Sequence, residues 1–448
     1  MITENKQIKV GMVSLGCPKN QIDAEIMLSL IKNASMEIAS DENKADVIIV
    51  NTCGFIEDAK KESIENILEI AELKKQNLKA LIVTGCMAER YREEIQKELS
   101  EVDAIIGIGK NSEIVQLIEN ALNGEKICCH SAKTNLPLNG DRVLSTPFYT
   151  AYIKIAEGCD NRCSYCAIPM IRGAFRSREI KDIILEAKQL AENGVKELVL
   201  VAQDTTRYGE DLYGKLELPH LLKKLCEIDK IQWIRILYAY PDKITDELLD
   251  VMAEHKKIVN YLDMPVQHCD SEILKAMNRK GDMESLLLLV KKMREKMPDI
   301  TLRTTLIAGF PGESEKQFET LCEFVKKAEF ERLGCFAYSP EEDTLAASFE
   351  NQIDEETKNR RKEIIMTEQY GISERKNRQK IGTKTDILVE GYDGYIKHFF
   401  GRSPADAPDI DGKVFFTGKI KYSEGSFASV LITDVLDYDL LGEALEDD

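Results

Sequence analysis

The sequence predicts an α/β protein in three parts: an N-terminal parallel α/β sheet domain, a central partial (β/α)6 barrel, and a small antiparallel β-barrel at the C-terminal end. Two patterns support this class. Short apolar runs alternate with helix-periodic stretches in two separate series along the chain. In the last 68 residues, strand-like runs are separated by Gly, Pro and Asp instead. We expect domains at 1–124, 147–380 and 381–448, with a linker over 125–146.

The composition is that of a globular protein. The 448 residues are 43% hydrophobic and 31% charged, which excludes a disordered chain. The net charge of −18 disfavours direct binding to nucleic-acid phosphates. No apolar run approaches the roughly 18 residues of a membrane span, and the charged first residues do not resemble a signal peptide. We therefore expect a cytoplasmic protein, whose twelve cysteines serve metal binding or catalysis rather than disulfides.

The first series of elements predicts the N-terminal sheet. Four apolar runs are typical of buried strands: Ile8–Ser14, Val47–Asn51, Leu81–Thr84 and Val102–Ile106. The stretches between and after them have helical periodicity: Gln21–Ile31, Ile56–Leu73, Arg92–Leu99 and Ser112–Leu122. A repeated strand–helix order predicts parallel strands with helices on both faces, and the polar stretch that follows predicts the linker.

The second series predicts the central barrel. Its strands are expected at Ala151–Ala156, Glu197–Val201, Trp233–Leu237, Val259–Met264, Leu302–Ile307 and Gly334–Tyr338. Six parallel strands are too few for a complete eight-fold barrel, so we expect a partial one. A charged helix over Glu355–Lys380 leads to the last part, where strands are expected at Thr385–Glu390, Val414–Thr417 and Ser429–Thr433.

A local cysteine triad follows the first strand of the barrel. Cys159, Cys163 and Cys166 have CxxxCxxC spacing. Three thiolates on one short loop can hold one corner of a 4Fe-4S cluster and leave its fourth iron open. An open iron can bind S-adenosylmethionine and pass an electron to its sulfonium. The alternative is a structural zinc site, which normally needs four ligands in two pairs.

A second, dispersed triad is predicted in the N-terminal sheet. Cys17, Cys53 and Cys86 each lie two or three residues beyond a predicted strand, and each is next to a glycine. The C-terminal ends of parallel strands share one edge, so these cysteines are expected to converge as a second set of three ligands. The alternative is three separate cysteines that act as small buried hydrophobic residues.

The central part, from about Tyr149 to Glu341, resembles the radical S-adenosylmethionine superfamily. The resemblance rests on the local triad and on the glycine-rich segment Ala308–Glu313. It implies that Tyr165 packs near the adenine of the cofactor. It further implies that Gln203 and Asp204, after the second strand, meet the cofactor's amino group. The alternative role for Gln203 and Asp204 is to cap their own loop.

With the dispersed triad included, nearly the whole chain resembles the methylthiotransferases. The segments that carry this resemblance are Ser14–Asn20, Asn51–Phe55 and Thr84–Arg90, and the C-terminal barrel corresponds to the TRAM domain of that family. The resemblance implies two 4Fe-4S clusters and S-adenosylmethionine as cofactors. It implies that one cluster cleaves the cofactor while the other holds the sulfur that becomes a methylthio group. An external electron donor is required, and the sulfur donor is not identified by the sequence.

Two further segments, Gly16–Asn20 and Glu157–Arg178, resemble the RimO branch of that family, which modifies the β-carbon of an aspartate on the twelfth protein of the small ribosomal subunit. The last 68 residues carry six basic and 14 acidic side chains, which suits a basic loop of a ribosomal protein. Asp406, Asp409 and Asp411 are candidate contacts for that loop, and the alternative is solvated surface. Two other functions remain open: methylthio transfer to an adenosine of transfer RNA, and a non-enzymatic iron–sulfur electron carrier.

Overall fold

The chain packs as two compact units that alternate along the sequence. The structure is a computed structural model, described over residues 7–445. Unit 1 consists of Met1–Thr146, Lys154–Arg178 and Ser339–Ala347. Unit 2 consists of Pro147–Ile153, Glu179–Tyr338 and Ser348–Asp448. The loop that carries the local triad thus packs with the N-terminal sheet in unit 1. The expected domain bounds remain a prediction.

Unit 1 is built on a parallel sheet with the strand order β2-β1-β3-β4-β5-β6. The strands are β1 (Lys9–Ser14), β2 (Glu37–Ile38), β3 (Val47–Thr52), β4 (Ala80–Gly85), β5 (Ala104–Ile106) and β6 (Ile127–Cys129). The four predicted strands are confirmed. Strand β6 lies in the stretch expected to be a linker, and it adds to the sheet because Ile127 and Cys129 pack against the core.

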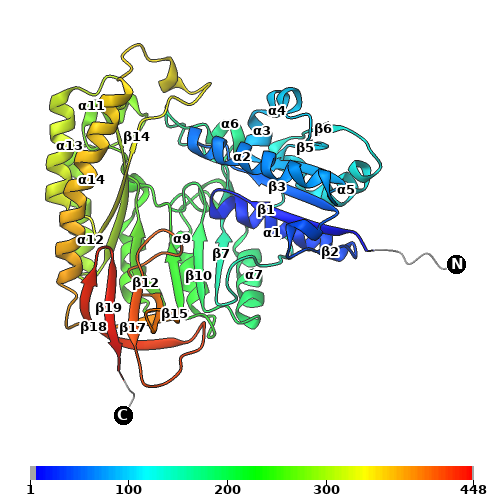
Figure 1. The fold of residues 1–448 in the computed structure, drawn as a ribbon. Helices are drawn as coiled ribbons and strands as arrows, with labels where there is room; N and C mark the ends of the chain where they lie inside the picture. The colour runs from blue at the N-terminus through cyan, green and yellow to red at the C-terminus, as the bar shows by residue number, and fades with distance from the viewer. Residues whose placement is uncertain (1–6, 446–448) are drawn as a thin grey trace. The chain divides into compact units, whose positions relative to one another are not determined.

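Helices cover both faces of this sheet, as Figure 1 shows in blue and cyan. They are α1 (Pro18–Asn33), α2 (Glu57–Glu72), α3 (Cys86–Arg90), α4 (Arg92–Glu98) and α5 (Ile114–Leu122), whereas the later helix α6 (Ile168–Arg172) packs against α3. Alternate residues of β3 face opposite ways: Val47 and Ile49 pack with α1 and α5, whereas Ile48 and Val50 pack with α2, α3 and α4. This period of two explains why β3 is apolar from Val47 to Val50 and β4 from Ala80 to Val83, since both of their faces are buried.

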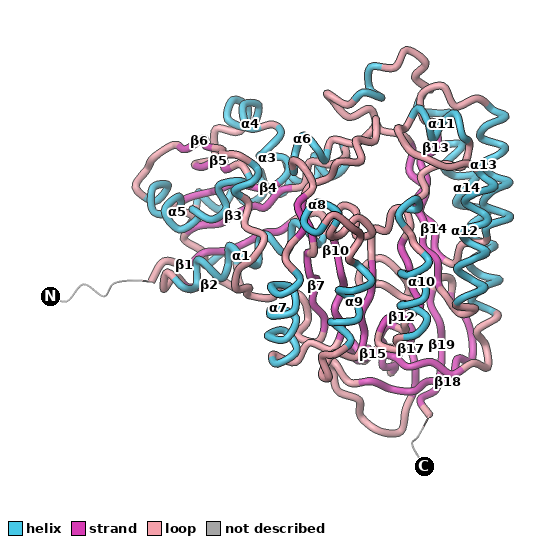
Figure 2. The backbone as a smooth tube through the Cα atoms, turned by 180° about the vertical axis from the view of Figure 1, so that it is seen from behind, coloured by secondary structure: helices cyan, strands magenta, loops and turns pink. Residues whose placement is uncertain are grey.

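Unit 2 contains the partial barrel, seen from behind in Figure 2. Its six described strands have the order β14-β13-β12-β11-β10-β7. The strands are β7 (Thr150–Lys154), β10 (Glu197–Val201), β11 (Trp233–Ile236), β12 (Ile258–Asp263), β13 (Thr301–Ala308) and β14 (Arg332–Ala337). The pairs from β10 to β14 are parallel, which confirms the predicted topology. The helices of unit 2 are α7 (Ile180–Glu192), α8 (Glu210–Tyr213), α9 (Leu218–Cys226), α10 (Asp246–Glu254), α11 (Ser271–Ala276), α12 (Met283–Lys296), α13 (Glu315–Ala328) and α14 (Glu355–Arg378).

The C-terminal part of unit 2 is a closed barrel, drawn in orange and red in Figure 1. Its strands are β15 (Lys384–Asp393), β16 (His398–Arg402), β17 (Val414–Thr417), β18 (Phe427–Leu436) and β19 (Asp439–Ala444). The barrel is mostly antiparallel as predicted, but β17 and β19 are parallel. The interior holds alternate residues of each strand, such as Ile387 and Val389 of β15 and Val430 and Ile432 of β18.

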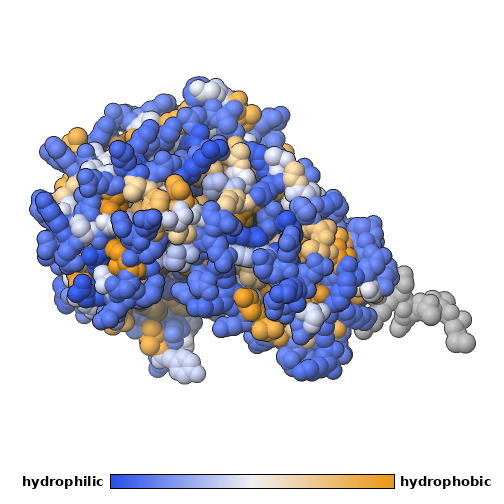
Figure 3. Space-filling view, turned by 90° about the horizontal axis from the view of Figure 1, so that it is seen from above, coloured by the Kyte–Doolittle hydropathy of each residue, from blue (hydrophilic) through white to orange (hydrophobic). Residues whose placement is uncertain are grey.

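The surface is polar over most of the face seen in Figure 3, where apolar side chains occur in small separate groups. Within residues 7–445, no helix has the length and apolar character needed to cross a membrane.

Candidate functional site

The strand register places the three dispersed cysteines at one edge of the unit 1 sheet. Ser14 of β1 is paired with Asn51 of β3, and Asn51 is paired with Thr84 of β4. Cys17 follows Ser14 by three residues, and Cys53 and Cys86 follow Asn51 and Thr84 by two residues each. The three thiols therefore leave neighbouring strands at the same end. The register thus agrees with the sheet edge that the spacing predicts, and the role of the three cysteines as one set of ligands stays a prediction.

A buried polar ladder holds these strand ends together. The Asn20 amide donates to the carbonyls of Leu15, Asn51 and Thr52 at 2.8, 3.3 and 3.2 Å. The Asn51 amide donates back to the carbonyl of Asn20 at 2.8 Å, and the Thr52 hydroxyl donates to the carbonyl of Thr84 at 2.5 Å. Since buried polar groups need partners, these bonds fix the positions of the loops that carry the cysteines.

The space beside Cys53 depends on Gly16. This glycine has a φ of +89°, and a Cβ added to it would stand 2.9 Å from the Cys53 sulfur. A side chain at position 16 would therefore both strain the backbone and occupy the space next to the thiol. Cys17 itself occupies the N-cap position of α1 without a side-chain capping bond, and Pro18 follows in the first turn. A helix N-terminus favours a negatively charged ligand such as a thiolate.

The dispersed thiols affect one another electrostatically, which shows that they are close. The pKa of the Cys86 thiol is raised to about 12, mainly by burial; the charge of Arg172 opposes this rise, and the charges of Cys17 and Cys53 contribute to it. Burial also raises the pKa of Cys53, against the effect of a backbone hydrogen bond from Phe55. Uncharged thiols of this kind must lose their protons when they ligate a metal.

The local triad lies on a loop that is closed at its base by two short antiparallel strands. These are β8 (Ala156–Glu157) and β9 (Arg176–Ser177). The Cys159 amide donates to the carbonyl of Gly173 at 3.0 Å, and the Cys166 amide donates to the carbonyl of Cys163 at 3.0 Å. Gly158 has a φ of +75°, and a Cβ there would overlap the carbonyl of Ala174. Its lack of a side chain lets the loop begin its turn toward Cys159.

The two triads belong to the same compact unit. Cys86 forms a small buried cluster with Ala167 and Ile171, which lie one and five residues after the third cysteine of the local loop. Helix α6, which begins after Ala167, therefore packs against helix α3, which begins with Cys86. The structure places the six predicted thiols in the same compact unit, although these cysteines are spread from position 17 to position 166 of the sequence.

The donor set fits iron–sulfur clusters, although the ligand geometry is not preformed. All twelve cysteines lie in the described residues, and none of them forms a disulfide bond. Within residues 7–445, no three His, Cys, Asp or Glu side chains are already arranged to hold a metal ion. Each triad nevertheless offers three thiols, and neither motif contains a fourth cysteine. Gly16 and Gly158 leave the backbone turns beside the thiols free of side chains. Soft thiolate ligands in threes suit a cluster with one open iron.

A buried charged network between the triads was not predicted from the sequence. Lys154 and Arg172 pair with Asp23 and Glu157, and all four side chains are at most 2% exposed. One signal could have indicated it: Lys154 ends an otherwise apolar strand, where a charged residue needs a buried partner. Arg176, which also belongs to the segment Glu157–Arg178, lies outside this network and donates to the carbonyls of Thr134 and Lys133, at 2.8 and 3.2 Å.

The residues expected to meet the cofactor lie in both units. Tyr165 is half-buried between Cys163 and Cys166 in unit 1. Gln203 is half-buried at the end of β10 in unit 2. Asp204 is fully buried, and its carboxylate accepts from the Thr206 hydroxyl at 2.7 Å and from the Arg207 amide at 3.2 Å. These bonds match the loop-capping role for Asp204.

Two of the three acidic residues proposed as substrate contacts are buried. Asp406 is 2% exposed and pairs with Arg332 at 2.7 Å. The side chain of Asp411 is 3% exposed; it accepts from the Tyr261 hydroxyl at 2.6 Å and lies 3.8 Å from Arg303. Both residues fasten the C-terminal barrel to the partial barrel inside unit 2. The expectation for Asp406 and Asp411 is therefore wrong, because arginines at the strands of the partial barrel take up their charges. Asp409 is exposed and stays a candidate.

The acidic loop also docks at the opposite end of the sheet from the expected cofactor residues. Arg332 is the first residue of β14, and Glu197, which pairs with Arg402 at 2.6 Å, is the first residue of β10. Gln203 and Asp204 instead follow the last residue of β10. In a parallel sheet the binding edge is the C-terminal one, so the docking loop lies at the structural edge.

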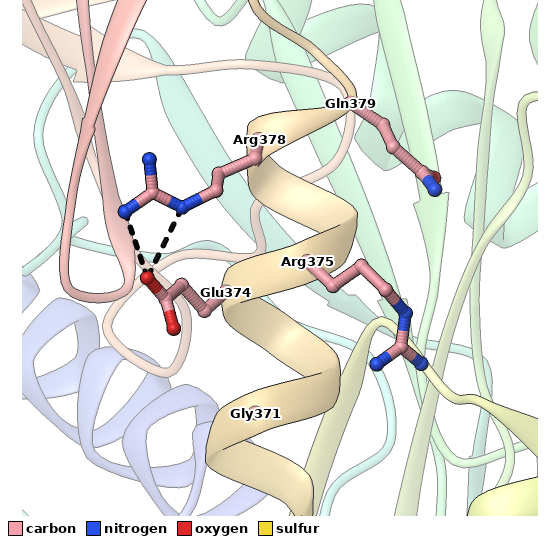
Figure 4. A pocket seen from close by; sticks show the side chains of 5 residues that line it. All are labelled: Gly371, Glu374, Arg375, Arg378 and Gln379. Carbon is pink, nitrogen blue, oxygen red and sulfur yellow. Dashed lines mark hydrogen bonds and ion pairs between the residues drawn. The ribbon is translucent and has the colours of Figure 1, made fainter.

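A shallow pocket on α14 is lined by none of the predicted site residues. It has a volume of about 380 Å³ and is lined by Gly371, Glu374, Arg375, Arg378 and Gln379. Figure 4 shows that these side chains come from successive turns of one helix end and that Arg378 is paired with Glu374. The pocket contains none of the cysteines, and we assign it no role.

Comparison with protein families matches three parts of the chain. The model of the uncharacterized protein family UPF0004 matches residues 9–107, which hold the dispersed triad. The model of the radical SAM superfamily matches residues 153–325, and that of the TRAM domain matches residues 381–445. The fold and the two cysteine triads thus define a radical SAM enzyme with a TRAM domain.

Relatives are similar over almost the full length. The ribosomal protein uS12 methylthiotransferase RimO of Thermoanaerobacter sp. (strain X514) is 48% identical over 435 residues, which cover 97% of this chain and 99% of the relative. RimO of Acetivibrio thermocellus is 49% identical over 447 residues, which cover 98% and 99%. RimO of Clostridioides difficile is 48% identical over 443 residues, which cover 98% and 99%. The chain belongs to this family of ribosomal protein uS12 methylthiotransferases.

Solved structures share the fold at low sequence identity. The radical S-adenosylmethionine methyltransferase TsrM from Kitasatospora setae matches with a TM-score of 0.54 and 13% identity, over 75% of this chain and 77% of that chain. The cobalamin-dependent radical enzyme OxsB matches with a TM-score of 0.52 and 13% identity, over 82% and 58%. These similarities concern the fold alone.

Proposed function

We propose that this protein adds a methylthio group to the β-carbon of an aspartate on the twelfth protein of the small ribosomal subunit. Its cofactors are two 4Fe-4S clusters and S-adenosylmethionine, as in the family to which the chain belongs. The observation that carries the assignment of the sites is the convergence of Cys17, Cys53 and Cys86 at one sheet edge, in the same unit as the CxxxCxxC loop.

The two triads have different roles in this proposal. Cys159, Cys163 and Cys166 hold the cluster that binds S-adenosylmethionine, and Cys17, Cys53 and Cys86 hold the second cluster. The first cluster would supply one electron for the cleavage of S-adenosylmethionine to methionine and a 5′-deoxyadenosyl radical, and the second would hold the sulfur that is transferred. Three protein ligands at each cluster leave one iron available for these tasks.

The chain's other residues orient the reactants. Tyr165 lies within the cysteine loop and is proposed to pack against the adenine of the cofactor. Gln203, at the C-terminal end of β10, is proposed to contact the cofactor's amino group. Asp204 supports that contact indirectly, because its capping bonds to Thr206 and Arg207 fix the loop that carries Gln203.

The partner is a basic segment of the ribosomal protein, which we propose to dock on the C-terminal barrel. The acidic side chains available for this contact are the exposed ones: Asp386, Asp409, Glu424, Asp434, Asp437 and Glu443. A surface with this charge attracts a basic loop and repels nucleic-acid phosphates. The reaction also needs an external electron donor. We place it in the cytoplasm, where twelve cysteines remain as free thiols.

A single substitution tests the assignment of the second cluster. We expect Cys17→Ala, after anaerobic reconstitution, to form 5′-deoxyadenosine with dithionite and S-adenosylmethionine but to give no methylthio product on the ribosomal protein. Cys128→Ala is the matched control, because Cys128 is an exposed thiol on the edge strand β6. Full product formation by Cys17→Ala would refute the assignment.

Two further outcomes address the other functions. Mass spectrometry of ribosomal protein and transfer RNA from a strain that lacks the gene distinguishes the two methylthiotransferase branches. The proposal expects the modification to disappear from the ribosomal protein alone. An electron carrier without enzymatic activity would form no 5′-deoxyadenosine in the assay, so the absence of this product from the wild-type protein also contradicts the proposal.

A further inference from the structure

A buried guanidinium contacts one of the proposed cluster ligands. Nη2 of Arg172 lies 3.3 Å from the sulfur of Cys86 and also donates to Asn20 Oδ1 at 3.1 Å. Nη1 of the same side chain pairs with Asp23 at 2.5 Å and with Glu157 at 3.2 Å. Arg172 is 2% exposed. All of its hydrogen-bonding partners named here lie in unit 1, so the contact belongs to one compact body.

The network around Arg172 is balanced in charge without the cysteine. Asp23 and Glu157 provide two negative charges, and Lys154, which pairs with them at 2.5 and 2.8 Å, provides the second positive charge beside Arg172. A structural ion-pair cluster would be complete at this point. The additional donor group of Arg172 nevertheless points to sulfur, and a neutral thiol is a weak acceptor. The contact becomes a strong one when the sulfur is a metal-bound thiolate.

The chain connects this contact to both triads. Arg172 lies on α6, six residues after Cys166 of the local loop. Glu157, its partner, precedes Cys159 by two residues, and Asn20 and Asp23 lie on the helix that begins after Cys17. Side chains that donate hydrogen bonds to cluster sulfurs favour the reduced, more negative state, and so they raise the reduction potential.

We infer that Arg172 is a positioning residue for the second cluster, which hydrogen-bonds the Cys86 sulfur and raises the reduction potential of the cluster that Cys86 helps to hold. This inference rests on the proposed function, because it takes Cys86 to be a ligand. The three cysteine ligands alone do not require such an arginine beside the cluster. The loop of the first cluster supplies the residue that sets the electronic properties of the second.

The test is a redox titration of the reconstituted holoenzyme, followed by electron paramagnetic resonance. Arg172→Lys keeps the positive charge that Asp23 and Glu157 need but shortens the reach to sulfur and removes the two-pronged geometry. We expect one of the two clusters to shift to a more negative midpoint potential and the other to keep its potential, with iron content unchanged. The matched control is Arg178→Lys: this arginine is also buried, and it donates to Asn139 and to the carbonyl of Lys154. We expect no shift from it.

A variant without the local triad identifies the cluster whose midpoint potential changes. In Cys159→Ala/Cys163→Ala/Cys166→Ala protein, the remaining cluster should show the same negative shift when Arg172→Lys is added. An unchanged potential of that cluster, or a shift confined to the local cluster, overturns the inference. If Cys17→Ala/Cys53→Ala/Cys86→Ala protein binds as much iron as the wild type, the proposed second site itself is wrong. The two failures are thus distinct.

A measurement without substitution of Arg172 covers the case in which Arg172→Lys fails to fold. The triple-alanine variant of the local triad is prepared with ¹⁵N-labelled arginine and reduced. Pulsed electron paramagnetic resonance should then detect a ¹⁵N coupling to the remaining cluster, as expected for an N–H hydrogen-bonded to its cysteine sulfur. The absence of this coupling from a fully loaded sample contradicts the inference.

Discussion

The two cysteine triads achieve the same result by different means. The local triad spans eight residues of one loop, closed by β8 and β9 and by the bond from the Cys159 amide to Gly173. The dispersed triad takes its cysteines from three strand ends, and a ladder of bonds through Asn20, Asn51 and Thr52 holds these ends in register. One site thus depends on the covalent spacing of its ligands, and the other depends on the sheet being folded.

This difference determines how each triad can be damaged. Substitutions far from Cys159 in sequence should leave the local loop intact, whereas the dispersed site is sensitive to any residue that alters the contacts between strand ends. The same contrast occurs among the acidic residues of the C-terminal barrel. Asp406 has its role through a distant arginine, but Asp409 is exposed on the loop where the sequence places it.

The largest effect is expected from Gly16→Ala. The new Cβ would overlap the region of the Cys53 sulfur, and the φ of +89° would strain the chain before Cys17. Bound iron should fall from about eight to about four per chain, because the local cluster remains. Iron analysis measures the loss, and 5′-deoxyadenosine formation measures whether the local cluster remains active. Gly124→Ala is the control, since it has a φ of +85° but nothing within 4 Å of the added Cβ. Equal iron loss in the two variants would show that backbone strain, not the cysteine pocket, is the cause.

The next effect distinguishes buried from exposed acids. Asp406→Ala removes the partner of Arg332 at 2.7 Å and leaves this buried charge only the more distant Asp411 at 4.0 Å, which should lower the free energy of unfolding by about 3–5 kcal/mol. Asp409→Ala should change it by less than about 0.5 kcal/mol and should weaken binding of the basic ribosomal segment. Denaturant unfolding is followed by the fluorescence of Trp233, the sole tryptophan, which packs against Phe427 of the C-terminal barrel. Similar destabilisation by both variants would contradict the distinction.

A third prediction concerns pH. Burial alone would raise the pKa of Glu197, but the charges and hydrogen bonds of Arg402 and Arg235 lower it to about 2. Because the folded-state pKa lies below the unfolded value, the stabilisation is complete above about pH 5 and is lost as the pH falls toward 2. It amounts to about 3 kcal/mol at neutral pH. Glu197→Gln should remove that amount at pH 7, and the difference from wild type should shrink at pH 3 in Trp233-monitored unfolding. A difference that is constant with pH would exclude an ionised Glu197 as the source.

The smallest effect tests a position that neither triad uses. Gly371 lies within α14, where an added Cβ would meet nothing within 4 Å. Gly371→Ala should therefore raise the free energy of unfolding by about 0.5–1 kcal/mol through the better helix propensity of alanine. Gly394→Ala, in the turn between β15 and β16 and also without a neighbour, should have no comparable effect. Calorimetric melting of both variants measures this, and both clusters should stay loaded.

The sequence alone was sufficient where the signal is short-range. It predicted the CxxxCxxC loop, four strands of the N-terminal sheet and the six strands of the partial barrel to within a few residues, and the long helix Glu355–Arg378, but not the short strands β2, β6, β8 and β9. It also predicted the convergence of Cys17, Cys53 and Cys86, because βα repeats place successive strand ends at one edge. Apolar periodicity and strand spacing contain this information directly.

Tertiary structure decided which charged residues are buried and with which partners. The sequence offers no sign that Arg172 reaches Cys86, or that Asp406 pairs with Arg332 across 74 positions rather than facing a partner protein. Exposed and buried acids look alike in a loop such as Ser403–Gly412. Their roles depend on Coulomb interactions between residues distant in the chain, and only folding brings those residues together.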